Sequence, residues 1–595
     1  SPFSLLSRKS DTARDQGEMM ITARSHVSVT LGRSFSHPPS APSSLEWDDV
    51  PTALPSSPHL SGTGRLARCA HKNHGKGRSD YRFIENVWPQ PRIFLQNDTD
   101  VFPFDPNLVK VVTAFSCDIM TSSLAGFSKR MSLVLSHSGP TKAQPLELHV
   151  IVDDDKCPST PQMGMVESYS LSVNKTHIVL QSMQVWGIVR GLESLSQLAF
   201  PSPIGLTMRV SHIEDAPRFP HRGLLLDTSR HFFSVRTIKA VIDLLAQNKF
   251  NVFHWHLTDN ESFPFKPKAY PEMVKGAFDE RHVYSQEEIK SIIAFARLRG
   301  IRVIPEIDTP GHTRSWGVGI PAITARCFDK LGKEDNDRAI LDPTNPLTYD
   351  VVSALFKEIF TLFPDRFAHL GGDETSFWIT QCWENNKNVT DYMKLWGMNT
   401  TSQLQQHYID RLLNHLTARD MPRKQFIVWQ ELLDMGMKMD QAIGHVWTGN
   451  TKKEQMGNMA KIVKGGHFAI LSSCWYLDHI SWNIDVKEYY DCDPQDLENV
   501  SEMERGRVLG GEAAMWGEMV DESNALPRIF PRASAVAEKL WSEEKYTKSV
   551  NGDKVWPRLY EWSCRMAERG FPVQPGNGPG YCPFEYQPAL PDLNY

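Results

Sequence analysis

The stretch His369-Leu370-Gly371-Gly372-Asp373-Glu374-Thr375-Ser376-Phe377-Trp378 places two carboxylates side by side, directly after a pair of glycines. The residues that lead into it, Arg366-Phe367-Ala368-His369-Leu370, are short and extended in character. Glycine has no side chain, so the backbone can turn there and a ligand can approach it closely. A strand that ends in this way delivers both acids to the rim of a sheet. The alternative for an Asp-Glu pair on its own is a surface turn with two solvated acids.

Seven other apolar segments, on both sides of this stretch, resemble buried strands. Gly223-Leu224-Leu225-Leu226-Asp227 is a continuous apolar run of the kind found in parallel sheets. Amphipathic helices are expected between them: one begins at Ser234, and another opens with a capping box from Ser285 to Glu288 and ends at Gly300. Strands alternating with helices predict an α/β fold, a (β/α)8 TIM barrel with a C-terminal tail. The eight expected strands are 223–227, 251–257, 301–306, 366–370, 426–429, 442–447, 468–472 and 508–513.

A doubly wound open sheet is the alternative fold for such a pattern. No Gly-rich dinucleotide fingerprint follows the first strand, which counts against it.

Composition and periodicity divide the chain into three expected parts. Residues 1–83 are rich in Ser, Pro, Arg and His and show no sustained period, so we expect a disordered or propeptide-like extension, with a docked arm as the alternative. Residues 84–217 combine alternating strands with a helix and predict a small α+β domain. Residues 218–595 hold the barrel and its tail.

Global properties exclude several classes of protein. The chain has 595 residues and a net charge of −6, which provides no basic field for binding nucleic acid. No window reaches the roughly 18 apolar residues that a membrane span needs. None of the nine cysteines forms a CxxC pair, which argues against a zinc ribbon. Sequons favour the secretory pathway and occur at Asn97, Asn174, Asn260, Asn388, Asn399 and Asn499.

The residues at the carboxyl ends of the expected strands suit a sugar pocket. Aromatic faces cover the apolar face of a pyranose ring, and charged groups bind its hydroxyls. Because barrel sites are built from these ends, we expect the site to contain Arg230, Asp259, His312, Asp373, Glu374, Trp429, Trp447, Tyr476, Trp516 and Glu518.

Two histidines of the second strand allow another interpretation. We expect His254 and His256 to face opposite sides of the strand and to serve packing. A metal site formed by these two with His312 is the alternative, although their spacing is not that of a metal-ligand motif.

Five motifs, in this order, resemble the family-20 glycoside hydrolases, and most closely the eukaryotic, lysosomal-type β-N-acetylhexosaminidases. The resemblance covers roughly residues 85–582 and includes the small domain before the barrel. The motifs are Asp227-Thr228-Ser229-Arg230-His231, His254-Trp255-His256-Leu257, Asp308-Thr309-Pro310-Gly311-His312-Thr313, His369-Leu370-Gly371-Gly372-Asp373-Glu374 and Trp516-Gly517-Glu518.

The resemblance implies retaining hydrolysis in which the substrate's own 2-acetamido oxygen is the nucleophile. Glu374 is then the general acid and base, Asp373 orients the acetamido N–H, and Tyr476 donates to its oxygen. His312 tunes Glu374, while Trp429, Trp447 and Trp516 enclose the acetamido group. Arg230 and Glu518 bind ring hydroxyls with Asp259 in support. No metal or organic cofactor is implied, and the alternative is a catalytically inactive sugar-binding or adhesion protein on the same scaffold.

Family position also implies three disulfides, Cys117–Cys157, Cys327–Cys382 and Cys564–Cys582. Cys474 and Cys492 flank Tyr476 and are candidates for an additional bridge, which leaves Cys69 odd. Disulfides and sequons together indicate the secretory pathway, with a lysosomal, vacuolar or extracellular destination. An oligosaccharide or glycoconjugate is the expected partner, and a homodimer is the family expectation.

Asp478 and His479 allow a prediction about whether the protein prefers neutral or charged substrates. In the family, an acid at the position of Asp478 resembles the subunit type that prefers neutral sugars over 6-sulfated ones. We expect Asp478 to repel a sulfate, and protonated His479 to offset that repulsion in part. Asp478→Asn is therefore expected to favour sulfated substrates, more strongly at low pH.

Overall fold

The computed structural model describes residues 87–582, with gaps at 139–140, 480–485, 549–551 and 577–579. The expected extension at residues 1–83 lies outside the described residues. None of the helices within the described ranges has the length and apolar character that a bilayer span requires.

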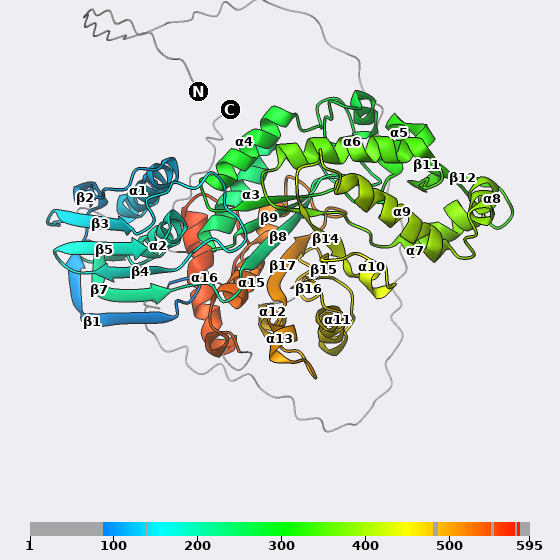
Figure 1. The fold of residues 1–595 in the computed structure, drawn as a ribbon. Coiled ribbons are helices and arrows are strands. Elements are labelled where there is room, and N and C mark those ends of the chain that lie inside the picture. Colours follow the sequence, from blue (N-terminus) through cyan, green and yellow to red (C-terminus); the bar gives the residue numbers. More distant parts are fainter. Residues whose placement is uncertain (1–86, 139–140, 480–485, 549–551, 577–579, 583–595) are drawn as a thin grey trace, which may run out of the picture. The chain divides into compact units, whose positions relative to one another are not determined.

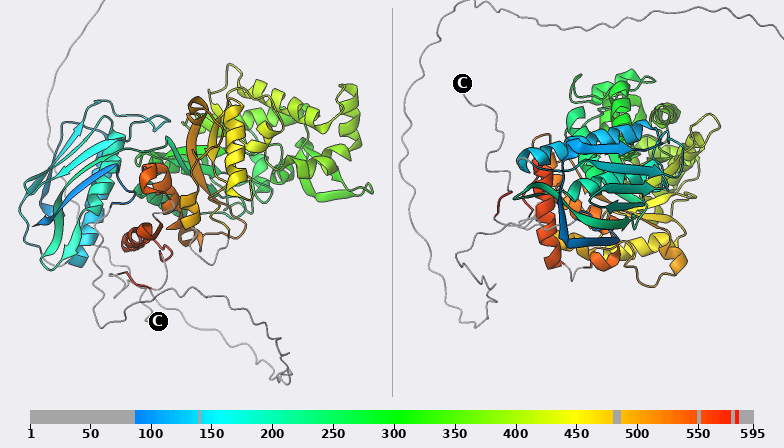
Figure 2. Two further views of the ribbon diagram at one scale, coloured as in Figure 1. Left: turned by 90° about the horizontal axis from the view of Figure 1, so that it is seen from below. Right: turned by 90° about the vertical axis from the view of Figure 1, so that its left-hand side faces the viewer.

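The first part of the described chain is a seven-stranded mixed sheet with two long helices. Its strand order is β1-β7-β4-β5-β3-β2, with β6 paired to β7. The two helices pack against each other, and α2 lies on β4 and β5 (Figures 1 and 2). Leu146, Leu148 and Val150 alternate with more exposed neighbours along β3, and all three are buried. The elements are β1 (Ile93–Pro103), β2 (Val109–Val112), α1 (Asp118–Ser138), β3 (Leu146–Val152), β4 (Tyr169–Val173), β5 (His177–Ser182), α2 (Val185–Gln197), β6 (Phe200–Ser202) and β7 (Gly205–Asp215).

The second part is a closed barrel of eight parallel strands, which confirms the predicted fold. Each of the eight predicted segments overlaps one barrel strand, and the capping box from Ser285 to Glu288 is present. Figure 1 shows the helices arranged around these strands. The strands are β8 (His221–Asp227), β9 (Val252–His256), β10 (Arg302–Glu306), β13 (Phe367–His369), β14 (Gln425–Trp429), β15 (Ile443–Val446), β16 (Phe468–Leu471) and β17 (Val508–Met515).

Helices follow most of the barrel strands, and an excursion after β10 and β13 adds a small satellite core. In that excursion, β11 (Thr324–Phe328) and β12 (Glu334–Leu341) form a two-stranded sheet, and α7 (Thr375–Ile379) and α8 (Lys387–Leu395) follow the acid pair. The longer helices are α3 (Val235–Gln247), α4 (Gln286–Arg297), α6 (Pro346–Leu362), α9 (Thr401–Leu416), α11 (Lys452–Lys464), α15 (Arg532–Trp541) and α16 (Gly552–Glu568). The shorter ones are α5 (Arg314–Gly319), α10 (Gln430–Asp434), α12 (Val486–Asp491), α13 (Glu502–Arg505) and α14 (Ala525–Ile529).

The barrel interior is layered, because successive side chains of a strand point to opposite faces. One interior layer is apolar and consists of Val252, Ile304, Phe367, Ile427, Ile443 and Ile470. The residues two positions further along these strands contact one another in a mostly polar layer, nearer the carboxyl ends: His254, Glu306, His369, Trp429, His445 and Ser472.

This layering corrects the expected orientation of the two histidines of β9. His254 and His256 are two residues apart, so they share one face of the strand. Both imidazoles contact the carboxylate of Glu306, at 3.1 and 2.7 Å. They belong to a buried polar network inside the barrel and do not pack on opposite sides of the strand.

Candidate active site

A cavity of about 260 Å³ lies at the carboxyl ends of the barrel strands. This volume is near the lower end of the range for small-molecule sites, which suits a single sugar unit. The cavity is lined by Arg230, His312, Asp373, Glu374, Trp429, Trp447, Tyr476, Asp478, His479, Trp516 and Glu518. Every site residue expected from the sequence is therefore brought together here, except Asp259, which lies behind the lining.

The backbone at the acid pair adopts a left-handed conformation. Gly371 and Gly372 have φ of +70° and +101°, and Glu374 has φ of +51°. A non-glycine residue in this region is strained by roughly 1–3 kcal/mol, so the surrounding structure must hold it there. One such restraint is the side chain of Asp308, which accepts a hydrogen bond from the Gly372 N–H at 2.7 Å.

His312 lies between the two acids and the barrel interior. Its Nε2 is 3.6 Å from Asp373 Oδ2 and 3.7 Å from Glu374 Oε2, and its Nδ1 is 3.0 Å from Asp259 Oδ1. Burial alone would lower the pKa of His312, but the carboxylates of Asp259 and Asp373 outweigh it and hold the pKa well above its usual value. The imidazolium form is therefore favoured beside the acids.

Glu374 is the more exposed of the two acids, with 39% of its side chain accessible against 12% for Asp373. Burial and the charge of Asp373 raise the pKa of Glu374, while His312 and Arg230 oppose the shift. A carboxyl group with a raised pKa that opens onto a cavity is suited to donating a proton.

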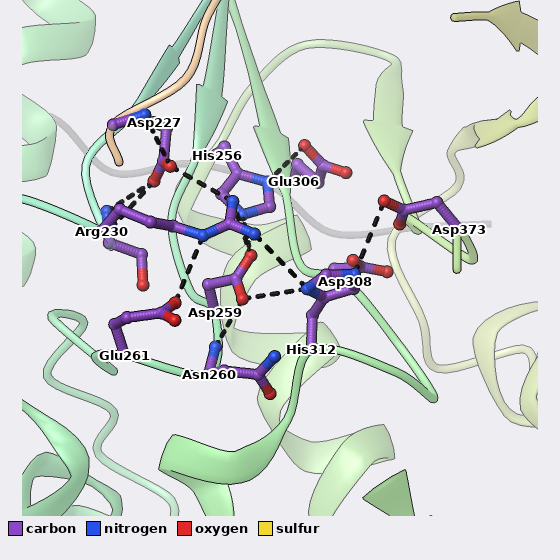
Figure 3. A network of polar contacts seen from close by, with 12 residues as sticks. Asp227, Arg230, His256, Asp259, Asn260, Glu261, Glu306, Asp308, His312 and Asp373 are labelled. Atoms are coloured by element: carbon purple, nitrogen blue, oxygen red, sulfur yellow. Dashed lines mark hydrogen bonds and ion pairs between the residues drawn. The ribbon is translucent and has the colours of Figure 1, made fainter. Parts of the chain in front are cut away.

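Asp259 is fully buried and holds two cationic side chains of the site in place. Its carboxylate is 2.8 Å from Arg230 Nη1 and 3.0 Å from His312 Nδ1, and Asn260 donates its backbone N–H to it (Figure 3). Burial opposes ionisation of Asp259, but His312 and Arg230 lower its pKa well below the usual range. Asp259 contacts these two side chains from behind and is not among the residues that line the cavity.

Arg230 is surrounded by acids, as Figure 3 shows. Besides Asp259, its guanidinium contacts Asp227 at 3.2 Å and Glu261 at 3.2 Å. Burial opposes its charge, but these acids raise its pKa further above the usual value, so it stays a cation at the cavity wall.

Aromatic side chains form the other walls of the cavity. The rings of Trp447 and Tyr476 stack at 6.4 Å between centroids, and those of Trp429 and Trp516 lie 6.0 Å apart. Trp429 is anchored from behind, since its indole N–H donates to Glu306 at 2.8 Å. Such a box of rings encloses a small, partly apolar group such as a methyl or acetamido group.

Sequence reasoning missed several residues that support the site. Asp308 begins the motif Asp308–Thr313, but the sequence does not indicate a role for it. Burial and the charge of Asp373 raise the pKa of Asp308 well above the usual value. Glu431 accepts the Trp447 indole N–H at 2.8 Å; burial and the charge of Asp373 raise its pKa to about 7. Glu431 lies two residues after Trp429, just beyond the end of a barrel strand, a position that marks it as a candidate.

The alternative metal site is not assembled in the described part of the chain. His256 and His312 bind opposite oxygens of Asp259, at 2.9 and 3.0 Å, and His254 lies deeper in the barrel. Among the described residues, four groups have ligand atoms within 4.8 Å of one another: Asp118 with the disulfide-bonded Cys117 and Cys157, His254 with Glu306 and His369, His254 with His445 and Glu512, and Asp308 with His312 and Asp373.

Comparison with known proteins places this architecture and cavity in a family. Residues 219–544 match the catalytic domain of glycosyl hydrolase family 20, and residues 87–198 match the domain described as beta-acetyl hexosaminidase like. This chain belongs to glycosyl hydrolase family 20.

Relatives within family 20 are similar over most of their length. The chain is 38% identical over 530 residues to beta-hexosaminidase A of Caenorhabditis elegans, covering 86% of this chain and 95% of that protein. It is 43% identical over 470 residues to beta-hexosaminidase subunit beta of Mus musculus, covering 77% and 84%. A solved structure, the Flavobacterium johnsoniae chitobiase, aligns with a TM-score of 0.70 at 31% identity, over 82% of this chain and 73% of that one.

Within the described ranges, four disulfides brace this family-20 structure. Cys117–Cys157, Cys327–Cys382 and Cys564–Cys582 are the pairs that family position implied. Cys474–Cys492 is the additional bridge, and it spans the segment that carries Tyr476. Two of the four therefore tie down segments next to the cavity, because Cys382 follows Glu374 closely in the chain.

The glycine pair provides a test of the local geometry. A Cβ on Gly371 would lie 1.7 Å from Asp308 Oδ1, so Gly371→Ala must displace the acid-bearing turn. We expect activity to fall by about a hundredfold or more, because displacements near 1 Å have that effect. Thermal unfolding and the rate of glycoside hydrolysis are the measurements.

Gly397→Ala is the matched control for this substitution. Gly397 has nearly the same backbone, with φ of +68°, but nothing lies within 4 Å of its added Cβ. Both variants pay the left-handed penalty of roughly 1–2 kcal/mol, and only Gly371→Ala meets Asp308. Equal activity in the two variants would contradict the assigned geometry.

Proposed function

We infer that the protein is an exo-acting β-N-acetylhexosaminidase that removes terminal non-reducing N-acetylglucosamine or N-acetylgalactosamine from glycoconjugates or chitooligosaccharides. The observation that carries this inference is the cavity itself, in which an adjacent acid pair faces a box of aromatic rings. The named hexosaminidase relatives support the same activity. Nothing in the site favours the inactive sugar-binding alternative, since both acids and Tyr476 line the cavity.

The proposed mechanism is retaining and uses the substrate's acetamido group. Two carboxylates that flank a scissile bond in an ordinary retaining enzyme are about 5–5.5 Å apart, and one of them attacks the sugar. Here the acetamido oxygen forms the bond to the anomeric carbon as the glycosidic C–O bond breaks, and the proton of Glu374 goes to the leaving oxygen. Water then attacks the anomeric carbon of the oxazolinium ion, gives its proton to Glu374, and reopens the ring.

The other side chains serve this cycle by position and charge. Asp373 is placed to accept the acetamido N–H and to balance its developing positive charge. Tyr476 is placed to donate to the acetamido oxygen before attack. Trp429, Trp447 and Trp516 exclude water around the group, while Arg230 and Glu518 bind ring hydroxyls.

A substrate panel tests the function and the nucleophile together. We expect the purified protein to cleave chitobiose and aryl N-acetylglucosaminides, and to leave the matching plain β-glucoside almost untouched, because the latter lacks the nucleophile. An N-acetylglucosamine-derived thiazoline is expected to bind far more tightly than N-acetylglucosamine, since it resembles the oxazolinium ion. Rapid glucoside cleavage or a trapped covalent glycosyl-enzyme would rule the mechanism out.

Glu374→Gln tests the proton donor. Loss of general acid catalysis is expected to slow substrates with poor leaving groups by about a hundred- to ten-thousandfold, and aryl glycosides with good leaving groups much less. In the wild type, donation is lost as pH rises through the raised pKa of Glu374, and this alkaline limb should disappear in the variant. The measurement is kcat/KM against pH for both substrate types; equal losses on both would show that Glu374 is not the donor.

Asp478 is proposed to disfavour 6-sulfated sugars, with a pH dependence opposite to the one expected from the sequence. Burial raises the pKa of Asp478, and Glu518 adds to the shift, while His479 and Arg528 oppose it. A raised pKa means that the carboxyl group is neutral at acidic pH and gains its charge only as pH rises. Repulsion of a sulfate therefore grows with pH.

Asp478→Asn is expected to raise the ratio of sulfated to neutral substrate turnover by on the order of tenfold above the pKa of Asp478, equivalent to about 1.4 kcal/mol. Below that pKa the ratio should approach that of the wild type, whose carboxyl group is already neutral. The two kcat/KM values are measured across the pH range. A wild type that hydrolyses both substrates equally at every pH would exclude this role.

We also propose that the protein acts in the secretory pathway, in a lysosome, a vacuole or outside the cell, and as a homodimer. The four disulfides support an oxidising compartment, and the sequons support glycosylation there. The homodimer rests on family resemblance alone. Enzymatic removal of N-glycans from the native protein tests its glycosylation. The molecular mass in solution tests the homodimer.

A further inference from the structure

One buried carboxylate inside the barrel faces both halves of the active site. Glu306 ends strand β10 and is fully buried. Its Oε1 accepts the indole N–H of Trp429 at 2.8 Å. Its Oε2 lies 2.7 Å from His256 Nδ1 and 3.1 Å from His254 Nε2. The two oxygens therefore bind different sets of side chains.

The first set leads to the aromatic box. Trp429 lines the cavity and is itself only 1% exposed, so its ring has little freedom apart from what its neighbours allow. The hydrogen bond to Glu306 holds its N–H edge toward the barrel interior. We therefore expect a displacement of the Glu306 carboxylate to shift this wall.

The second set leads to the acid pair. His256 Nε2 lies 2.9 Å from Asp259 Oδ2, and Asp259 Oδ1 lies 3.0 Å from His312 Nδ1. His312 in turn faces Glu374 at 3.7 Å. Figure 3 shows Glu306, His256, Asp259 and His312 side by side in this order. The path from Glu306 to the acid thus consists of three contacts of 2.7 to 3.0 Å and a longer ion-pair contact of 3.7 Å at its end.

The groups along this path carry alternating charge. Burial opposes ionisation of each, but their partners prevail: the pKa of Glu306 lies well below its usual range, that of His256 well above, that of Asp259 below and that of His312 well above. Anion and cation therefore follow each other from the barrel interior to the cavity, so the removal of one charge leaves its neighbour unpaired.

Other strands also present titratable groups to this pair. His369 of β13 lies 3.1 Å from Glu306 Oε1, and burial lowers its pKa, so it stays neutral. Asp227 of β8 acts on His256, and Asp308 lies two residues beyond Glu306. The groups packed behind His254 and His369 are His221, His445 and Glu512.

We propose that Glu306 is a positioning residue that couples the two halves of the site, holding the Trp429 wall with one oxygen and the His256–Asp259–His312 path to Glu374 with the other. The proposal rests on the proposed function, because it assigns the wall to the acetamido group and the path to proton donation. Glu306 does not touch the substrate.

Two readouts separate the two halves. The affinity for an N-acetylglucosamine-derived thiazoline reports the acetamido wall. The dependence of kcat/KM on leaving-group pKa reports proton donation, because poor donation makes that dependence steeper. A residue with a merely structural role changes stability without moving either readout selectively.

Glu306→Gln keeps the shape of the side chain and removes its charge and one acceptor. We expect this variant to weaken thiazoline binding and to steepen the leaving-group dependence together, each by about ten- to hundredfold. His256→Asn interrupts the path to the acid, and it should change the leaving-group dependence much more than the thiazoline affinity; its ring also packs against Trp516 at 5.0 Å between centroids. Trp429→Phe removes the N–H donated to Glu306 together with part of the ring that lines the cavity, and it should change thiazoline affinity much more than the leaving-group dependence.

Glu512→Gln is the matched control. Glu512 is another buried carboxylate of the barrel interior, and its ion pairs are with His221 and His254, neither of which lines the cavity. It should lower the unfolding temperature while leaving both readouts near those of the wild type. If Glu306→Gln behaves like Glu512→Gln in both readouts, the proposal is wrong.

Two further outcomes are also decisive. If Glu306→Gln does not fold, the test rests on His256→Asn and Trp429→Phe. The proposal fails if either of these variants changes both readouts equally. A wild type that does not hydrolyse N-acetylglucosaminides overturns the proposed function itself. An active wild type with an unaltered Glu306→Gln overturns only the coupling role.

Discussion

An ionised side chain is stable inside a protein only when opposite charges and hydrogen bonds replace the water that it loses. The interior of this barrel meets that condition by alternating carboxylates with imidazoles across neighbouring strands. Glu306 and Asp259 each contact at least two imidazoles, whereas Glu374 at the cavity is 39% exposed and its pKa is raised. The reactive carboxyl group is thus the one with the fewest close partners in a series that runs outward through Glu306, His256, Asp259, His312 and Glu374.

Backbone geometry then decides how two acids that are adjacent in the chain take different surroundings. The left-handed turn at Gly371, Gly372 and Glu374 separates the two side chains, so that Asp373 is largely buried near Asp308 while Glu374 opens onto the cavity. Glycine makes the turn accessible, and the carboxylate of Asp308 holds it by accepting the Gly372 N–H. Strain at the acid is tolerated because the packed strand β13 precedes it.

Much of the fold was predictable because parallel barrel strands are buried on both faces and leave continuous apolar runs. The site was predictable to the extent that strand ends converge in a barrel. The predicted orientation of His254 and His256 was wrong, because side chains two residues apart in a strand point to the same face. Glu306 could not be predicted as a functional residue, since the sequence of an apolar strand does not indicate which side chains contact its last residue across the barrel. The place of Asp259 behind the cavity also depends on a loop conformation that local sequence does not encode.

The size of the cavity has a consequence for how a polymeric substrate is consumed. A pocket of about 260 Å³ suits one terminal sugar, so the effective substrate concentration is the concentration of chain ends and not the mass concentration of the polymer. Long chains present few ends per unit mass and are degraded slowly, one residue at a time. An enzyme that cuts such chains internally would create new ends and raise the throughput of this one without any contact between the two proteins.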